Sequence, residues 1–155
     1  MNLSIQEKRK LFLDSYDSIN YRTFINLGNV THADYSDLTN KVNCISFGYS
    51  LYSLTNLTKE DSLIWDKLLI TLKDFKNLNE LDFSEFHKEV PEFFFTNLKD
   101  NINFIFNPSV DYHPTIKKYQ AQETINFLKE KKINLLHKLD LIEDKIKKME
   151  SILNS

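Results

Sequence analysis

The last 41 residues of the chain, 115–155, contain neither glycine nor proline, and this absence constrains the fold more than any other feature. Proline breaks an α-helix and glycine weakens one, so a Lys- and Glu-rich segment without either residue is expected to form one continuous helix. A helix from Thr115 to Leu153 would be about 58 Å long at about 1.5 Å per residue. The preceding 114 residues should form a body only ~34 Å across, so part of this helix is expected to extend beyond it.

Apolar residues recur in this segment at alternating steps of three and four, which is the spacing of a coiled-coil seam. This pattern predicts that the chain associates with itself, most simply as a homodimer. Packing of the helix on its own body is the alternative, because further apolar residues widen the stripe. The predicted seam consists of Ile125, Leu128, Lys132, Leu135, Leu139, Ile142, Ile146, Met149 and Leu153, and the additional apolar residues are Phe127, Ile133, Leu136 and Leu141.

The charges beside the seam leave the orientation of a dimer open. In a parallel dimer, Lys138 would meet Glu143 of the second copy, and Lys145 would meet Glu150. Lys132, the polar interruption of the seam, would then face its own copy. An antiparallel pair would avoid that repulsion.

Two prolines at positions 108 and 114 mark the boundary between this helix and the rest of the chain. The sequence therefore predicts a mostly α-helical protein, with a compact helical body at 1–107, a linker at 108–114 and a long amphipathic, coiled-coil-like helix at 115–155. The body can also include a small β-hairpin.

Several segments of the body carry helix start signals. A capping-box pattern at Ser4 and helically spaced apolar residues predict a helix over residues 5–19. Thr31 opens a second, short helix by the same logic. A stronger helix is expected after Thr58, because apolar residues through Phe75 cover about half of its circumference.

Two segments of the body are harder to assign. Residues 42–54 alternate like a strand but also fit a helical spacing, and we favour a buried helix. Residues 91–106 are predicted to form a helix after Pro91, with Phe93 and Phe104 on the face opposite the main apolar stripe. Those two rings are either core residues or a pair of contacts for a partner protein. Residues 93–98 and 104–106 could instead be strands, and they are the segments that could pair with a strand at 42–54.

Composition excludes several classes of function. Glycine occurs only at positions 28 and 48, so phosphate-binding loops and most all-β folds, which depend on glycine, are disfavoured. The single cysteine, Cys44, cannot form an internal disulfide, and the N-terminus lacks the apolar stretch of a signal peptide, so we expect a cytoplasmic protein. No segment is apolar enough to predict a membrane span.

The sequence provides no strong candidate for a catalytic or metal site, and we expect neither an enzyme nor a cofactor. The four histidines are scattered singly, which argues against structural zinc. Glu85 and His87 are close in sequence, but residues two apart on a helix point in different directions, so we interpret them as surface charges. His32 with Ser36 could be drawn as a hydrolytic pair, without the strained turn that such a nucleophile uses.

Two alternatives remain beside a protein-interaction function. Residues 21–42 resemble a degenerate helix-turn-helix, which together with the Lys-rich tail would imply a DNA-binding transcriptional regulator. Asp140, Glu143 and Lys145 resemble a nuclease pattern, so an unrecognised metal-dependent hydrolase or nuclease is the other alternative. We recognise no family, and the sequence favours a non-enzymatic interaction module, such as a small inhibitor, an immunity-type protein or an adaptor, that occupies the surface of another protein.

Overall fold

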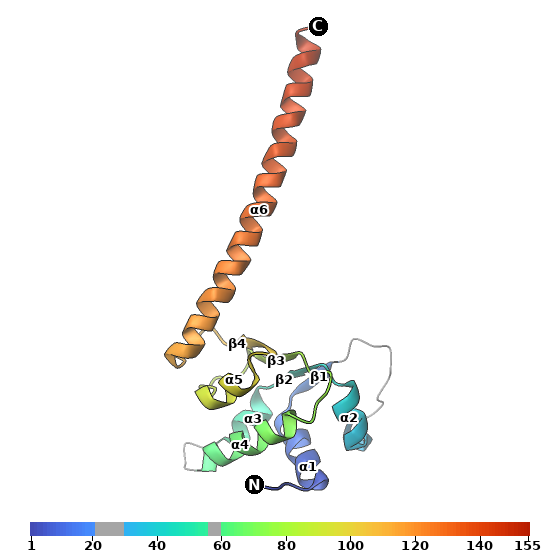
Figure 1. The fold of residues 1–155 in the computed structure, drawn as a ribbon, viewed down its shortest axis with the longest axis vertical. Helices are drawn as coiled ribbons and strands as arrows, with labels where there is room; N and C mark the ends of the chain where they lie inside the picture. The colour runs from blue at the N-terminus through green and yellow to red at the C-terminus, as the bar shows by residue number, and fades with distance from the viewer. Residues whose placement is uncertain (21–29, 56–59) are drawn as a thin grey trace. The chain divides into compact units, whose positions relative to one another are not determined.

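The computed structural model of the chain describes residues 1–20, 30–55 and 60–155 and divides into two compact units. The first unit is Met1–His113, which is built of short helices and strands, and the second is Pro114–Ser155, which is a long helix (Figure 1).

The first unit alternates short helices with the strands of a sheet. Its elements in chain order are α1 (Ile5–Ser15), β1 (Ser18–Asn20), the 3₁₀ turn η1 (Val30–His32), α2 (Tyr35–Lys41), β2 (Cys44–Ser46), α3 (Tyr49–Leu54), α4 (Glu60–Leu72), β3 (Glu80–Phe83), α5 (Glu92–Leu98) and β4 (Asn103–Phe106). The four-stranded sheet has the order β1-β2-β3-β4, in which β1 is antiparallel to β2 and the other neighbours are parallel. Parallel neighbours need crossover connections, which α3 and α4 provide between β2 and β3, and α5 between β3 and β4.

One face of this sheet is buried, and the other carries mostly polar side chains in contact with solvent. Ile45, Leu81 and Phe104 lie side by side in register on the buried face and are at most 4% exposed. The preceding register position brings Glu80 beside Asn103 on the opposite face, where both side chains keep contact with solvent. Figure 1 shows α1, α3 and α4 together on one side of the sheet.

Aromatic rings fill the space between the sheet and the helices. Phe83 on β3 stacks on Phe47 at a ring-centroid distance of 5.1 Å and on Phe104 of β4 at 6.0 Å. Trp65 on α4 meets Phe94 of α5 edge to face at 4.9 Å. All five side chains are at most 4% exposed. Paired rings contribute about 0.5–1.5 kcal/mol beyond their burial, so this cluster is the main core of the unit.

The predicted capping box is confirmed, although the helix that it starts is shorter than expected. Ser4 Oγ accepts a hydrogen bond from the Glu7 N–H at 3.1 Å, and the Glu7 carboxylate accepts one from the Ser4 N–H at 3.4 Å. The helix ends at Ser15, and residues 18–20 pair with β2 as strand β1.

The prediction of a mostly α-helical body at 1–107 is wrong, because that region contains the four-stranded sheet. The small number of glycines made β structure unexpected, because tight β-hairpins depend on glycine. The sheet avoids this requirement, because its parallel strands are joined by helices rather than by hairpins.

The helix predicted over residues 91–106 is also wrong in its second half. The helix α5 ends at Leu98, and β4 follows with the alternating exposed and buried residues of a half-buried strand. Phe104 is therefore a core residue of the sheet, 4% exposed, and is not a surface contact. Phe93 lies on α5 and is partly exposed, so the two rings do not form a pair on one helix face.

Residues 42–54 combine the two structures between which the sequence could not decide. The segment begins as β2, whose central residue Ile45 is fully buried, and continues as α3 from Tyr49. The favoured interpretation as one buried helix is therefore wrong for the first half of the segment.

The second unit is the helix α6, Pro114–Leu153, of 40 residues. Proline at its first position is favourable, because that residue needs no N–H donor and its backbone angle already suits a helix. Every residue from 121 to 155 is exposed. The uninterrupted helix agrees with the absence of glycine and proline from this segment.

Candidate functional site

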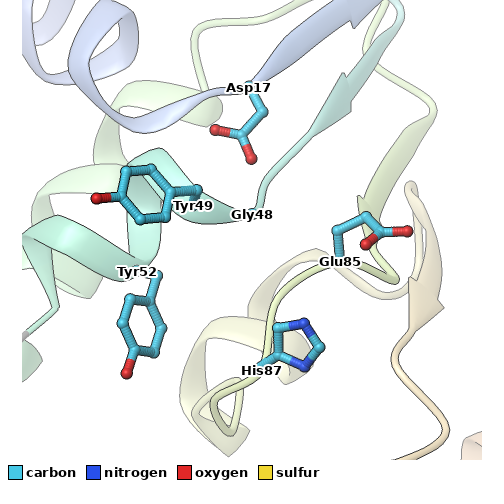
Figure 2. Close-up of a pocket in the computed structure, with 6 residues that line it drawn as sticks. All are labelled: Asp17, Gly48, Tyr49, Tyr52, Glu85 and His87. Carbon is cyan, nitrogen blue, oxygen red and sulfur yellow. The ribbon is translucent and has the colours of Figure 1, made fainter.

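The first candidate site is a pocket of about 670 Å³ at one edge of the sheet. The parallel strands β2 and β3 both end at this edge, and the antiparallel β1 begins there. In sheets with parallel strands, ligands characteristically bind at the carboxyl ends of the strands, and ligand pockets span roughly 300–1,000 Å³. The residues that line this pocket are Asp17, Gly48, Tyr49, Tyr52, Glu85 and His87 (Figure 2).

Asp17 is held in place by the start of α3. Its Oδ1 accepts a hydrogen bond from the backbone N–H of Ser50 at 2.9 Å. A Cβ atom on Gly48 would lie 2.3 Å from Oδ2 of Asp17 and 3.3 Å from Cβ of Glu85, so any larger residue would displace the carboxylate. Within the described residues, Oδ2 of Asp17 accepts no hydrogen bond, and it remains an acceptor for a ligand.

His87 has its tautomer fixed by Asn107, the residue that follows β4. Oδ1 of Asn107 accepts the Ser109 N–H at 2.9 Å, which identifies the other amide atom as the nitrogen. That nitrogen is 3.2 Å from Nδ1 of His87 and can only donate, so Nδ1 accepts. In its neutral form, the ring therefore carries its hydrogen on Nε2 and can donate to a ligand.

Two tyrosines supply aromatic surface beside these polar groups. Tyr49 is 80% exposed and Tyr52 is 46% exposed, which is unusual for large rings in a chain with a well-formed core. In Figure 2, Tyr52 and His87 lie on opposite sides of the open space next to Gly48. The ammonium group of Lys88 lies 4.6 Å from the centroid of the Tyr52 ring, in a cation–π contact.

The pocket thus combines a hydrogen-bond acceptor, a donor and aromatic faces, which suits a small planar polar group. Among the described residues, no group of three or more His, Cys, Asp or Glu side chains could hold a metal ion. Sequence reasoning missed this site, since it placed Glu85 and His87 on a helix. Both residues instead follow β3 in a loop and reach the same pocket. The available sequence signal was Gly48. A chain with only two glycines is expected to keep one where a larger side chain would not fit.

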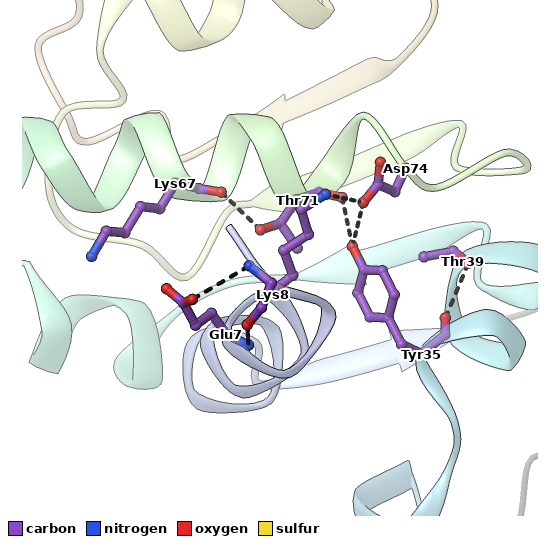
Figure 3. A network of polar contacts seen from close by, with 8 residues as sticks. Glu7, Lys8, Tyr35, Thr39, Lys67, Thr71 and Asp74 are labelled. Carbon is purple, nitrogen blue, oxygen red and sulfur yellow. Dashed lines mark hydrogen bonds and ion pairs between the residues drawn. The ribbon is translucent and has the colours of Figure 1, made fainter. Parts of the chain in front are cut away.

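A polar network elsewhere in the first unit has a structural role (Figure 3). Asp74, which follows α4, accepts hydrogen bonds from Lys8 of α1 and from the Tyr35 hydroxyl of α2, each at 2.8 Å. Burial raises the pKa of Asp74, but the two hydrogen bonds and the Lys8 charge outweigh burial and hold that pKa below its usual value. Burial and the hydrogen bond to this carboxylate raise the pKa of Tyr35. The network ties three helices together.

The second candidate site is the predicted seam on α6. A continuous helix keeps residues at seam spacing on one face, and all the seam residues lie between Pro114 and Leu153. The apolar members are 44% exposed at Ile125, 49% at Leu139 and 83% at Leu153, with the others between these values. The additional apolar residue Phe127 is 64% exposed. The helix therefore carries a long apolar surface that its own residues do not cover.

The remaining candidates from the sequence lie on two short helical segments, on α6, or in part outside the described residues. His32 ends η1 and Ser36 belongs to α2, so they do not share the helix face on which the hydrolytic pair was drawn. Asp140, Glu143 and Lys145 are exposed on α6. The first half of the helix-turn-helix resemblance, residues 21–29, lies outside the described residues.

Comparison with models of protein families, with curated proteins and with solved structures finds no match to this chain. Of the helices in the described parts of the chain, none is both long enough and apolar enough to cross a membrane.

Proposed function

We propose that this chain is a non-enzymatic protein-interaction module, such as a small inhibitor, an immunity-type protein or an adaptor, that associates with itself through α6. The proposal rests on one observation, which is the exposed apolar seam along an unbroken helix of 40 residues. The interaction would take place in the cytoplasm, where a lone thiol such as that of Cys44 stays reduced.

Exposed apolar area provides the driving force. Complete burial of a Leu or Ile side chain contributes about 1.5–3 kcal/mol relative to full exposure. Leu139 at 49% and Ile146 at 51% exposure retain about half of that stabilisation for a contact with another helix. A second helix with the same spacing would cover this stripe by knobs-into-holes packing, whereas isolated apolar surface residues would gain no such continuous contact.

Light scattering at micromolar concentration tests the proposal. The unmodified chain should have a mass above the 18.4 kDa of the monomer. Leu139→Asp together with Ile146→Asp should restore the monomer mass, because each change places a carboxylate in the seam. Asn134→Asp together with His137→Asp is the matched control, since it adds two carboxylates to the same helix outside the seam.

The control pair should associate like the unmodified chain. A mass of 18.4 kDa for the unmodified chain at these concentrations would reject self-association. Equal loss of association in both double variants would mean that charge on the helix, rather than the seam, controls the mass.

A further inference from the structure

We infer that the second copy on α6 lies parallel to the first and in register with it. This inference rests on the proposed self-association and adds the orientation of the partner helix. It is argued from the charged residues that border the seam on its two sides, all of which are exposed on one continuous helix.

The two borders of the seam differ in charge. The lysine flank consists of Lys131, Lys138 and Lys145, each of which precedes a seam residue by one position. The glutamate flank consists of Glu143 and Glu150, each of which follows a seam residue by one position. Because α6 continues unbroken from Pro114 to Leu153, each flank stays on its own side of the seam.

Parallel alignment pairs opposite charges. In a parallel two-stranded coiled coil, a residue on the first border meets the residue five positions later on the second border of the other helix. Lys138 then meets Glu143 of the second copy, Lys145 meets Glu150, and the twofold symmetry repeats both pairs. Lys131 meets Leu136, which adds no repulsion.

Antiparallel alignment brings like charges together. In that arrangement, each border of the seam faces the same border of the other helix, so the lysine flank meets the lysine flank. In the antiparallel register that overlaps the most seam residues, with Leu128 opposite Leu153, Lys138 meets Lys145 of the second copy, twice by symmetry. Lys129 would meet Glu150 there, which offsets part of the repulsion without removing it.

Lys132 selects the register. In the parallel, in-register dimer, it lies opposite its own copy, and both long side chains can direct their ammonium groups toward solvent. Antiparallel packing would place it against Met149 or Ile142 and allow the same extension to solvent, so the charges of the two flanks decide the orientation and Lys132 decides only the register of the parallel pair. A single polar residue in a seam commonly fixes register in this way, at a cost in stability.

Charge exchange between the flanks distinguishes the two orientations. Lys138→Glu with Lys145→Glu, and separately Glu143→Lys with Glu150→Lys, should each weaken self-association about tenfold or more, since attractive pairs become repulsive. In parallel dimers, an equimolar mixture of the two double variants should form heterodimers with the affinity of the unmodified chain. In antiparallel dimers, the Lys-to-Glu variant should instead pair best with the unmodified chain, and that preference would overturn the inference.

Cysteine cross-linking of the full chain gives an independent measurement. In a Cys44→Ser background, Leu128→Cys and Leu153→Cys lie about 38 Å apart along one helix. A parallel dimer should give disulfides between identical variants, and a mixture of the two should give none between different variants. Disulfides formed only between different variants would overturn the parallel orientation while leaving self-association intact. A monomer mass for the unmodified chain would reject both proposals.

Discussion

Apolar side chains form both the core of the first unit and most of the seam of α6, yet the core is buried and the seam is exposed. Phe83, Phe94 and Leu81 are fully buried between the sheet and its helices. In the seam, Leu135, Ile142 and Ile146 are 55%, 55% and 51% exposed. In the first unit, the sheet and the helices packed on it bury one another's apolar faces. The α6 unit is a single helix, which cannot cover its own apolar stripe. Apolar periodicity thus predicts that a face will contact another element. Whether that element belongs to the same chain depends on whether the chain provides a second layer to pack on that face.

The largest effect is expected when one aromatic ring is removed from each region. Phe104→Ala should lower the free energy of unfolding by about 3–5 kcal/mol, because Phe104 packs on several rings of the core. Phe127→Ala on α6 should leave it within about 0.5 kcal/mol. Fluorescence of Trp65, the only tryptophan, reports unfolding of the first unit in denaturant. Equal losses in the two variants would mean that α6 contributes to the core of the unit.

A smaller effect is expected where the seam is interrupted. Lys132→Leu should tighten self-association by about 2–3 kcal/mol per dimer, since two apolar side chains replace two lysine side chains in one layer of the seam. Lys147→Leu makes the same replacement outside the seam and serves as the control. Sedimentation equilibrium of the two variants measures the change. Equal tightening by both would attribute the effect to hydrophobicity in general rather than to the seam.

The smallest effect concerns the polar network that ties α1, α2 and α4 together. Asp74→Asn should destabilise the first unit by about 1–2 kcal/mol near neutral pH, because charged hydrogen bonds to Lys8 and Tyr35 are lost. The folded pKa of Asp74 is below its ordinary value of 3.8, so this stabilisation is present above that pH and disappears as the pH falls through the folded pKa.

The Asp74→Asn variant should therefore lose less stability than the unmodified chain on acidification below pH 4. Asp14→Asn is the matched control, because its ion pair with Lys10 is exposed on the surface and should contribute little. Denaturant titrations at pH 7 and pH 3 give both comparisons. An unchanged pH dependence in the Asp74 variant would remove this network from the acid response.

Local signals were sufficient to predict the long elements of this fold. The capping box at Ser4 and the composition of residues 115–155 each determine a helix through interactions within the helix. The strands escaped prediction because they are three or four residues long, too short for alternation to be distinguished from helical spacing. In residues 91–106, no glycine or proline marks the change from α5 to β4, so two elements together imitate one amphipathic helix.

The two candidate sites also differ in whether local sequence patterns can predict them. The seam depends on spacing within one helix, and the sequence alone predicts it. The pocket depends on residues that come together only when strands pair, since Asp17 precedes β1 while Gly48 and His87 follow β2 and β3. Pairing between strands that are distant in sequence leaves no local pattern. Asp17 could not have been recognised before the register of the sheet was known.

The pocket acquires a further consequence if α6 pairs as inferred. Each chain carries one such pocket, and a parallel dimer would join two of them through the adjacent beginnings of α6. A target with two copies of the recognised group, spaced so that both can reach their pockets, would then bind the second pocket as an intramolecular step. Binding to both pockets would be tighter than binding to one. A target with two copies of the group would therefore dissociate more slowly than a target with one copy.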